Sequence, residues 1–329
     1  MRRIPIEQAF FKGAVSVESK DGGMKPWRIP YEQLALFPPN GLGGHAAAAA
    51  GVRLAFLSDT RTVHVHFAPS EQPLVLDCVI ADKLIATVTV PAGDKSAVFA
   101  DLPAGGKEIQ IYLPQRSPIL VYRLEIEEGA SFSEAAPSSR PKWVTYGSSI
   151  TQCSMAASPA QTWPALVARE RGWDLTCLGY NGNCHLEPMV ARLIRDQEAD
   201  FISLCLGINV MGQQSLNIRT FRASVIGLVS IIREKHPTIP IAVISPIYSP
   251  DREQQELAVG LNLVQMRSEL VEAVEALRSC GDRNLHYVNG LEVLGEAGLP
   301  YMPDRLHPNA EGYRIMARGM LEQFARLPV

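Results

Sequence analysis

The sequence predicts two domains of different class: an all-β sandwich or jelly roll, followed by an α/β domain built on a parallel sheet. Two patterns along the 329 residues support this division. Short β-prone runs separated by turn residues fill positions 50–127, whereas strand-like and helical stretches alternate after position 142. We therefore expect a sandwich at 1–130, a linker at 131–142 and an α/β domain at 143–329.

The N-terminal part contains seven β-prone runs with no helical stretch between them. Apolar and polar residues alternate clearly in two of these runs, which is typical of strands with one buried face. Seven such strands favour an antiparallel sandwich. The Gly- and Pro-rich first 45 residues are expected to add edge strands or to wrap the sandwich. The seven runs are Val52–Leu57, Thr62–Phe67, Leu74–Ile80, Leu84–Val90, Ala97–Leu102, Glu108–Leu113 and Ile119–Ile126.

The C-terminal part alternates between five strand-like runs and five helical stretches. This alternation predicts a parallel sheet with helices on both faces, and ligands bind at the carboxyl ends of the strands in such sheets. The strand-like runs are Val144–Tyr146, Leu175–Leu178, Phe201–Leu206, Ile239–Ile244 and Leu285–Val288. The helical stretches are Ala160–Arg171, Glu187–Asp196, Leu216–Lys235, Glu253–Ser279 and Ala310–Arg326.

Composition and charge narrow the range of partners. The net charge of −3 provides no basic face, so we expect no nucleic-acid partner. No run of about 18 apolar residues exists, so we expect no membrane span. Residues 1–8 lack the apolar region of a secretory signal, and the six cysteines form no C-x-x-C pair. These features predict a cytoplasmic location, and they leave the oligomeric state open.

The segment Trp143–Thr151 carries the strongest chemical signal. A β-prone run ends at Gly147 and is followed by two serines, and a serine held just past a strand end can be aimed at a substrate. Asp304 and His307 lie three residues apart, close enough to meet across one turn. Ser149 as nucleophile, His307 as base and Asp304 as the group that orients the base would form a catalytic triad.

Ser149 does not lie in the nucleophile elbow of α/β-hydrolases. That elbow requires a second glycine after the serine, in the pattern G-x-S-x-G, whereas this turn reads Gly-Ser-Ser-Ile-Thr. Four blocks instead resemble the SGNH hydrolase superfamily, the GDSL-type esterases and lipases. In chain order the blocks are Gly147–Thr151, Leu178–Asn183, Gly207–Val210 and Asp304–His307.

The resemblance implies a flavodoxin-like, three-layer fold and an oxyanion hole. Its donors would be the backbone N–H groups of Ser149 and Gly182 and the side-chain amide of Asn209. It implies no metal and no cofactor. Two positions depart from the family pattern, because Ser148 and Val210 stand where the family usually has aspartate. Neither departure removes a role from the predicted triad.

Four further residues are candidates for binding. His185 and Asn183 lie in the loop after Gly182 and are candidate substrate-binding residues. His64 and His66 lie two apart on one face of a predicted strand, as metal ligands can. No Cys, Asp or Glu cluster accompanies them in the sequence, so we expect exposed strand residues and no metal site.

The predicted function is that of a serine esterase acting on carboxylic esters with a short acyl group. A sandwich ahead of an SGNH domain resembles the layout of some carbohydrate acetylesterases, so the substrate is expected to be a small-molecule or carbohydrate ester. Two alternatives remain open. The acyl-enzyme could pass its acyl group to another alcohol, giving an acyltransferase, or the protein could be a glycan-binding protein with a vestigial site.

Overall fold

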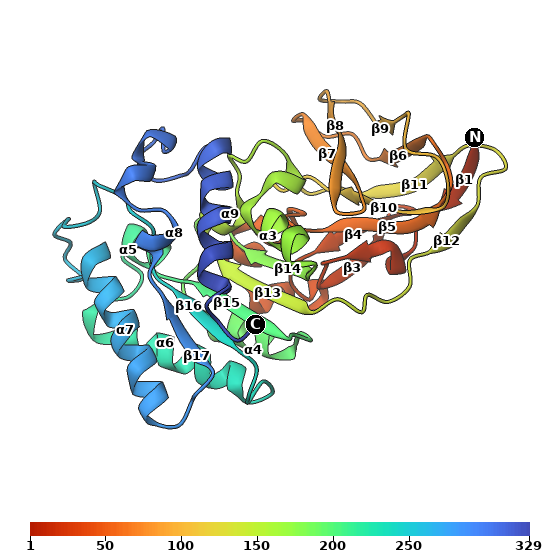
Figure 1. The fold of residues 1–329 in the computed structure, drawn as a ribbon. Helices are drawn as coiled ribbons and strands as arrows, with labels where there is room; N and C mark the ends of the chain where they lie inside the picture. Colours follow the sequence, from red (N-terminus) through yellow and green to blue (C-terminus); the bar gives the residue numbers. More distant parts are fainter.

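The computed structural model describes residues 1–329, and its N-terminal part is a sandwich of two antiparallel sheets (Figure 1). The seven predicted runs correspond to β5 through β11, which confirms the predicted β-sandwich. The strands are β1 Arg2–Pro5, β2 Phe11–Lys12, β3 Ser16–Lys20, β4 Gly23–Trp27, β5 Arg53–Ser58, β6 Val63–Phe67, β7 Leu74–Ile80, β8 Lys83–Val90, β9 Ser96–Phe99, β10 Lys107–Tyr112, β11 Val121–Ile126 and β12 Phe132–Glu134.

Strand order shows how the first 45 residues are used. One sheet has the order β3-β4-β11-β6-β9, with β1 also paired to β11. The other has the order β12-β5-β10-β7-β8, with β2 also paired to β5. The early strands β1 to β4 therefore extend the sandwich. A shared apolar core lies between the two sheets, because alternate residues of each strand point inward.

The predicted linker at 131–142 is not irregular throughout. Phe132 lies in β12, which pairs with β5, and its ring stacks on Phe56 and meets Phe10 edge to face. This aromatic contact continues the sandwich core into the segment, so the sandwich extends as far as Glu134. The first strand of the second domain then begins at Lys142.

The C-terminal part is a five-stranded parallel sheet of order β14-β13-β15-β16-β17. Numbered from the first strand of this domain, the order is 2-1-3-4-5, which is the flavodoxin-like arrangement that the family resemblance implied. The strands are β13 Lys142–Gly147, β14 Asp174–Gly179, β15 Phe201–Cys205, β16 Ile241–Ile244 and β17 Leu285–Val288.

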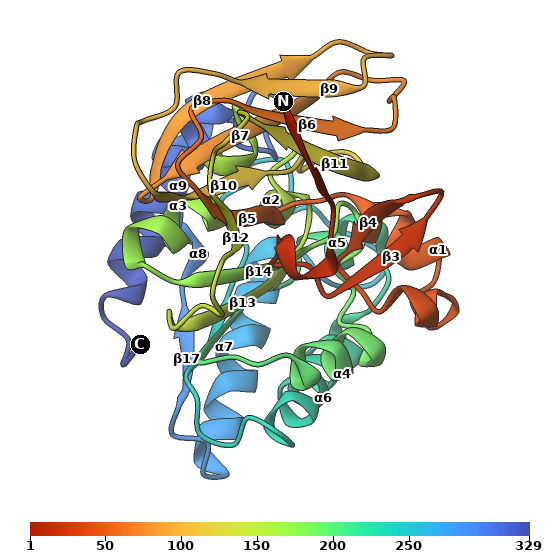
Figure 2. The same cartoon turned by 90° about the vertical axis from the view of Figure 1, so that its right-hand side faces the viewer.

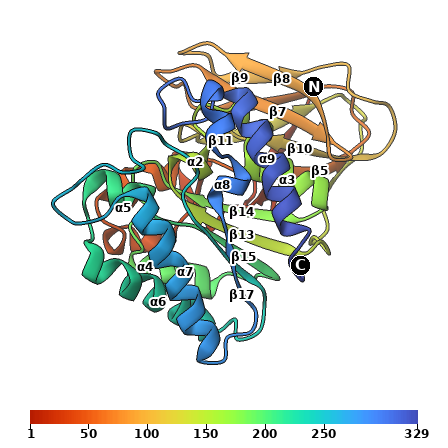
Figure 3. The same ribbon diagram turned by 60° about the vertical axis from the view of Figure 1, so that its left-hand side comes forward.

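Helices cover both faces of the parallel sheet, as predicted (Figure 3). The helices α4, α6 and α7 pack on one face, and α3 and α9 pack on the other. The longer helices are α3 Trp163–Arg171, α4 Pro188–Asp196, α6 Ile218–Arg233, α7 Leu263–Ser279 and α9 Ala310–Phe324. The shorter helices are α1 Asn40–Gly43, α2 Ser149–Gln152, α5 Ile208–Gln213 and α8 Gly290–Val293.

Helix α7 begins ten residues later than the predicted start at Glu253. Asn262 caps the helix in a reciprocal capping box with Gln265, which ends the preceding loop at that point. Glu253 is used differently, because its carboxylate binds the guanidinium of Arg267 at 2.6 Å. None of the helices is both long and apolar enough to cross a membrane.

The segment between β4 and β5 packs against the α/β domain rather than the sandwich (Figure 2). Ile29, Phe37, Leu42 and Ala46 are buried in the same apolar cluster as the strands and helices of one sheet face. The two domains are therefore joined by this apolar cluster. Residues 1–130 include the sandwich and also a segment that packs on the α/β domain. The domain boundary at 131–142 stays a prediction, and one apolar cluster contains residues from both sides of it.

Arg28 is the most deeply buried charged residue at this junction, with no exposed surface. Its guanidinium donates to the carbonyl oxygens of His45 and Ala48, both at 2.6 Å, within the same segment. It also donates to the carbonyl oxygens of Cys177 and Gly179, at the end of β14. Five fixed N–H donors make arginine suited to collecting several carbonyl groups at once. Arg28 therefore ties the N-terminal segment to the parallel sheet.

Replacement of Arg28 by methionine is expected to destabilise the whole chain. Methionine fills part of the volume but leaves buried carbonyl groups without donors, at about 1–3 kcal/mol each. We expect Arg28→Met to lower the free energy of unfolding by at least about 3 kcal/mol, measured by urea titration followed through tryptophan fluorescence. The exposed Arg116 provides the control, since Arg116→Met should change stability by less than about 0.5 kcal/mol. Equal unfolding midpoints for Arg28→Met and the wild type would contradict this role.

Candidate active site

The predicted catalytic residues meet at the carboxyl edge of the parallel sheet. Ser149, Gly182 and Asn209 follow the ends of β13, β14 and β15, which are neighbouring strands. Asp304 and His307 lie in the loop before α9. Because parallel strands end at the same edge, residues separated by more than 150 positions are brought to one place.

A tight turn presents Ser149 at the start of α2. Ser148 is the N-cap of this helix, and its Oγ accepts a hydrogen bond from the Ile150 N–H at 3.2 Å. A serine can therefore occupy the position of the family aspartate, because capping needs an acceptor oxygen but no charge. Gly147 is required by space, since a Cβ there would lie 2.1 Å from the Thr151 hydroxyl oxygen.

Ser149, His307 and Asp304 form a continuous chain of hydrogen bonds. The Ser149 Oγ lies 2.8 Å from His307 Nε2, and His307 Nδ1 lies 2.6 Å from Asp304 Oδ2. The other carboxylate oxygen of Asp304 accepts from the backbone N–H of His307 at 2.7 Å and of Leu306 at 3.1 Å. With Nδ1–H donating to Asp304, Nε2 is left to accept the hydroxyl proton of Ser149.

Asp304 is held as a carboxylate although its side chain is partly buried. Partial burial raises its pKa, but the hydrogen bonds from the His307 ring, the His307 N–H and the Leu306 N–H lower the pKa by more. The resulting pKa lies below the ordinary value of 3.8. A carboxylate at this position keeps the His307 ring oriented toward Ser149 at neutral pH.

Three donors at the site have no acceptor within the protein. The Ser149 N–H is the first of α2, so no helical carbonyl group precedes it. The Gly182 N–H and the Asn209 side-chain nitrogen also make no hydrogen bond in the structure. Asn209 Oδ1 accepts from the Cys184 N–H at 3.1 Å, which orients the amide and leaves its NH₂ free. These are the three donors that the family resemblance implied.

The neighbouring loop supports Gly182 through its carbonyl group. His185 Nε2 lies 3.0 Å from the Gly182 oxygen, and the Gln213 amide donates to the same oxygen. His185 Nδ1 lies 2.7 Å from the Ser215 hydroxyl oxygen. Both ring nitrogens of His185 are therefore engaged by protein groups, which gives this candidate substrate-binding residue a structural role in the loop.

Asn183, the other candidate substrate-binding residue, contacts neighbouring protein groups, and Val210, a departure from the family pattern, packs in the core. Asn183 donates to the Asn181 carbonyl oxygen at 2.5 Å and lies against Gly43 of the N-terminal segment. Val210 is fully buried in the apolar cluster beneath the site, where an aspartate would be desolvated. An apolar side chain at this position therefore contributes to the core.

Gln152 is a buried residue near the site that sequence reasoning missed. Its side-chain oxygen accepts from the Asn181 N–H at 2.9 Å, and its NH₂ donates to the Gln115 carbonyl oxygen at 3.1 Å. One amide thus connects α2, the loop that carries Gly182 and the sandwich. A glutamine in a short helix carries no sequence signal for this role, because its partners come from distant segments.

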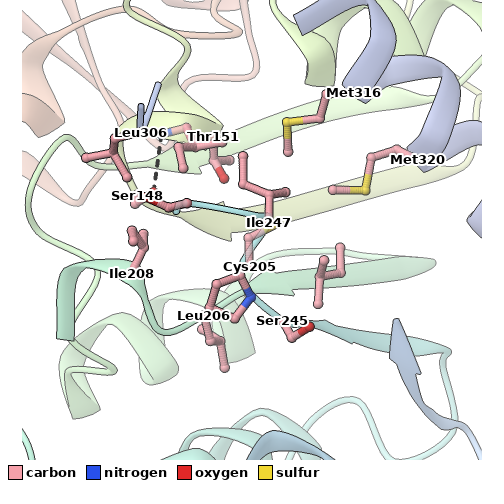
Figure 4. Close-up of a pocket in the computed structure, with 14 residues that line it drawn as sticks. Ser148, Thr151, Cys205, Leu206, Ile208, Ser245, Ile247, Leu306, Met316 and Met320 are labelled. Carbon is pink, nitrogen blue, oxygen red and sulfur yellow. Dashed lines mark hydrogen bonds between the residues drawn. The ribbon is translucent and has the colours of Figure 1, made fainter. Parts of the chain in front are cut away.

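A small apolar pocket with a cavity volume of about 30 Å³ is lined by residues that neighbour the predicted triad in the chain (Figure 4). Ser148, Leu306 and Ile208 line it, and each is the immediate chain neighbour of a predicted site residue. Ile247 and two methionines of α9, Met316 and Met320, also line the pocket (Figure 4). The size and the mostly apolar lining of this pocket suit a small uncharged group.

The lowered pKa of Asp304 predicts a pH-dependent stability. A carboxyl whose pKa is lower in the folded state stabilises the fold above its unfolded pKa of about 3.9, and this contribution is lost as the pH falls through the folded value. We expect Asp304→Asn to be less stable than the wild type at pH 7, with the difference shrinking as the pH falls below about 4. Urea unfolding at a series of pH values measures this. A difference that stays constant across the series would contradict it.

Comparisons with known proteins match both parts of the chain. A model of the GDSL-like lipase/acylhydrolase family matches residues 141–321, and a model of the SsfX3 N-terminal domain matches residues 9–119. The solved salicylyl-acyltransferase SsfX3 from a tetracycline biosynthetic pathway is 35% identical with a TM-score of 0.92, and the match covers 100% of this chain and 98% of that one. Curated proteins provide no significant match.

More distant structures share the fold. A putative GDSL-like lipase from Bacteroides ovatus is 20% identical with a TM-score of 0.79, covering 99% of this chain and 97% of that one. A family two carbohydrate esterase from Clostridium thermocellum, solved with cellohexaose, is 15% identical with a TM-score of 0.68, covering 94% and 96%. The chain belongs to the GDSL-like lipase/acylhydrolase family and is an acyl-transferring enzyme.

Proposed function

We propose that the protein is a serine esterase that forms an acyl-enzyme on Ser149 and releases the acyl group to water. The observation that carries this proposal is the chain of hydrogen bonds from Ser149 through His307 to Asp304. In this role Ser149 is the nucleophile, His307 the general base and Asp304 the residue that orients the base.

Acylation would begin when the Ser149 oxygen attacks the ester carbonyl carbon and its proton passes to His307 Nε2. The carbonyl oxygen becomes an oxyanion, which the N–H groups of Ser149 and Gly182 and the amide of Asn209 can stabilise. Removing one such donor typically costs roughly 3–4 kcal/mol of transition-state stabilisation. His307 then returns the proton to the leaving alcohol as the carbon–oxygen bond breaks, leaving the acyl group on Ser149.

Deacylation repeats the same steps with water as the nucleophile. His307 takes a proton from water, the hydroxide oxygen attacks the acyl carbon, and the proton returns to Ser149 as the acid leaves. The His307 side chain is 23% exposed and that of Asp304 is 47% exposed, so solvent reaches this end of the triad. Access of water supports hydrolysis as the outcome of the reaction.

The pocket beside Ser149 supports a small apolar acyl group. Ile208, Ile247 and Leu306 line it together with the two methionines of α9. No charged side chain lines this pocket, so an acyl group that carries a carboxylate would be desolvated without a partner. We therefore assign the acyl half of the substrate to the apolar pocket and the alcohol half to the solvent-facing side.

An acyltransferase is the second candidate, and one specific observation favours it. The salicylyl-acyltransferase SsfX3 is 35% identical over the whole chain, including the N-terminal domain. An alcohol bound on the solvent-facing side could replace water in deacylation with no change in the triad. The likeness to a carbohydrate esterase shows the fold alone, and it makes acetylated sugars a substrate class to test beside simple esters.

Substitution of the predicted nucleophile tests the proposal directly. We expect Ser149→Ala and His307→Ala to lower turnover of p-nitrophenyl acetate by roughly 10⁴-fold or more while circular dichroism stays unchanged. Mass spectrometry after treatment with a fluorophosphonate should find stoichiometric label on Ser149. Ser148→Ala is the matched control and should keep the label. A wild-type protein that takes no label would favour a glycan-binding protein with a vestigial site.

A chain-length series with product analysis separates the two reactions. We expect kcat/KM to fall steeply from p-nitrophenyl butyrate to longer linear esters, because the apolar pocket has a cavity volume of only about 30 Å³. Chromatography of the products with and without added sugars or other alcohols then identifies the acceptor. Free acid as the main product in the presence of every alcohol supports the esterase, whereas a new ester as the main product establishes the acyltransferase.

A further inference from the structure

His64 and His66 lie on the outer face of the sandwich, close to an acidic residue. Along β6, Val63, Val65 and Phe67 are buried in the core, so the two histidines point to the opposite face. Antiparallel pairing with β11 places Glu125 directly opposite His64. The structure thus brings one acidic residue beside these histidines from a strand about 60 residues away, which the sequence pattern around them did not indicate.

The atoms of this cluster are spaced like ligands of one ion. One ligand atom from each of His64, His66 and Glu125 lies within 4.8 Å of the others. His66 Nε2 and Glu125 Oε2 are 3.2 Å apart, yet Nε2 is enclosed and makes no hydrogen bond of acceptable geometry. In a tetrahedral zinc site with bonds near 2.0–2.1 Å, neighbouring ligand atoms lie about 3.4 Å apart. The close, misaligned pair therefore has the spacing of two co-ligands.

The carboxylate of Glu125 is held in place from its other side. Its Oε1 lies 3.0 Å from Arg123 Nε and 3.3 Å from Arg3 Nε, while Oε2 faces His66. Outer partners of this kind orient ligating carboxylates in metal sites. The two arginines also repel a dication, so we expect weaker binding than in structural zinc sites.

We propose that His64, His66 and Glu125 bind a divalent transition-metal ion of the zinc type. Two imidazole nitrogens and one carboxylate oxygen are the ligands, and a water molecule would complete a tetrahedral set. Imidazole ligands select zinc and its neighbours over calcium or magnesium, which prefer oxygen. The ion would join β6 to β11 in the sheet of order β3-β4-β11-β6-β9. This site is separate from the predicted triad and does not depend on the proposed esterase reaction.

The test uses the full-length protein freed of metal with a chelator and titrated with Zn²⁺ by isothermal calorimetry. We expect one bound equivalent in the wild type and at least about tenfold weaker binding in His64→Gln and His66→Gln. His286→Gln is the matched control, because the His286 Nε2 is also enclosed and unpartnered but belongs to no ligand cluster. It should bind like the wild type.

Two further measurements keep the result unambiguous. His307→Ala should retain the Zn²⁺ equivalent, since loss of binding there would locate the ion at the triad and overturn the proposal. Zn²⁺ at about 100 times its Kd should raise the Tm of the wild type by a few degrees but not that of His66→Gln. No saturable binding by the wild type, or equal binding by His64→Gln and His66→Gln, would also overturn it.

Discussion

The buried guanidinium of Arg28 holds the segment between β4 and β5 against the end of β14. It has no carboxylate partner. Its N–H groups donate to carbonyl groups of two segments, one between β4 and β5 and the other at the end of β14. Tyr180 follows that strand, and its hydroxyl donates to the Arg28 carbonyl oxygen at 2.6 Å. Because Gly182 lies two residues further on, the position of a predicted oxyanion donor is coupled to the N-terminal part of the chain. The sandwich is thus part of the scaffold of the site.

Gln152 at the end of α2 provides a second connection between the site and the sandwich. Gln152 joins the loop of Gly182 to the Gln115 carbonyl group of the sandwich. Buried polar groups that are fully satisfied hold a unique arrangement, because any displacement leaves one of them without a partner. The short helix that presents Ser149 is therefore fixed by tight turns at its start and by hydrogen bonds at its end. This rigidity suits a nucleophile that must be aimed at a carbonyl carbon.

The departures from the usual family pattern are explained by local packing. Ser148 retains the capping function with a neutral oxygen, and Val210 fills an apolar core position beneath the site. Both changes remove negative charge from the surroundings of Ser149. The reaction proposed here concentrates the required carboxylate at Asp304, where backbone N–H groups and the His307 ring hold it ionised. In the proposed reaction, hydrolysis and acyl transfer would use the same residues, and the acceptor that attacks the acyl-enzyme would decide between them.

The two fold classes, the strands β5 to β11 and β13 to β17, and the four blocks of the predicted site could be predicted from the sequence alone. These signals are local: a period of two residues marks half-buried strands, and glycine followed by serine marks the turn at Gly147. Only the tertiary structure decided which distant groups meet. The contact of Arg28 with Gly179, the pairing of Glu125 with the histidines of β6, and the continuation of the sandwich at Phe132 all join segments far apart in the chain. Such partners depend on packing and on backbone pairing. No local pattern in a single sequence indicates which carbonyl group a side chain will bind, or which residue will lie opposite it in a sheet.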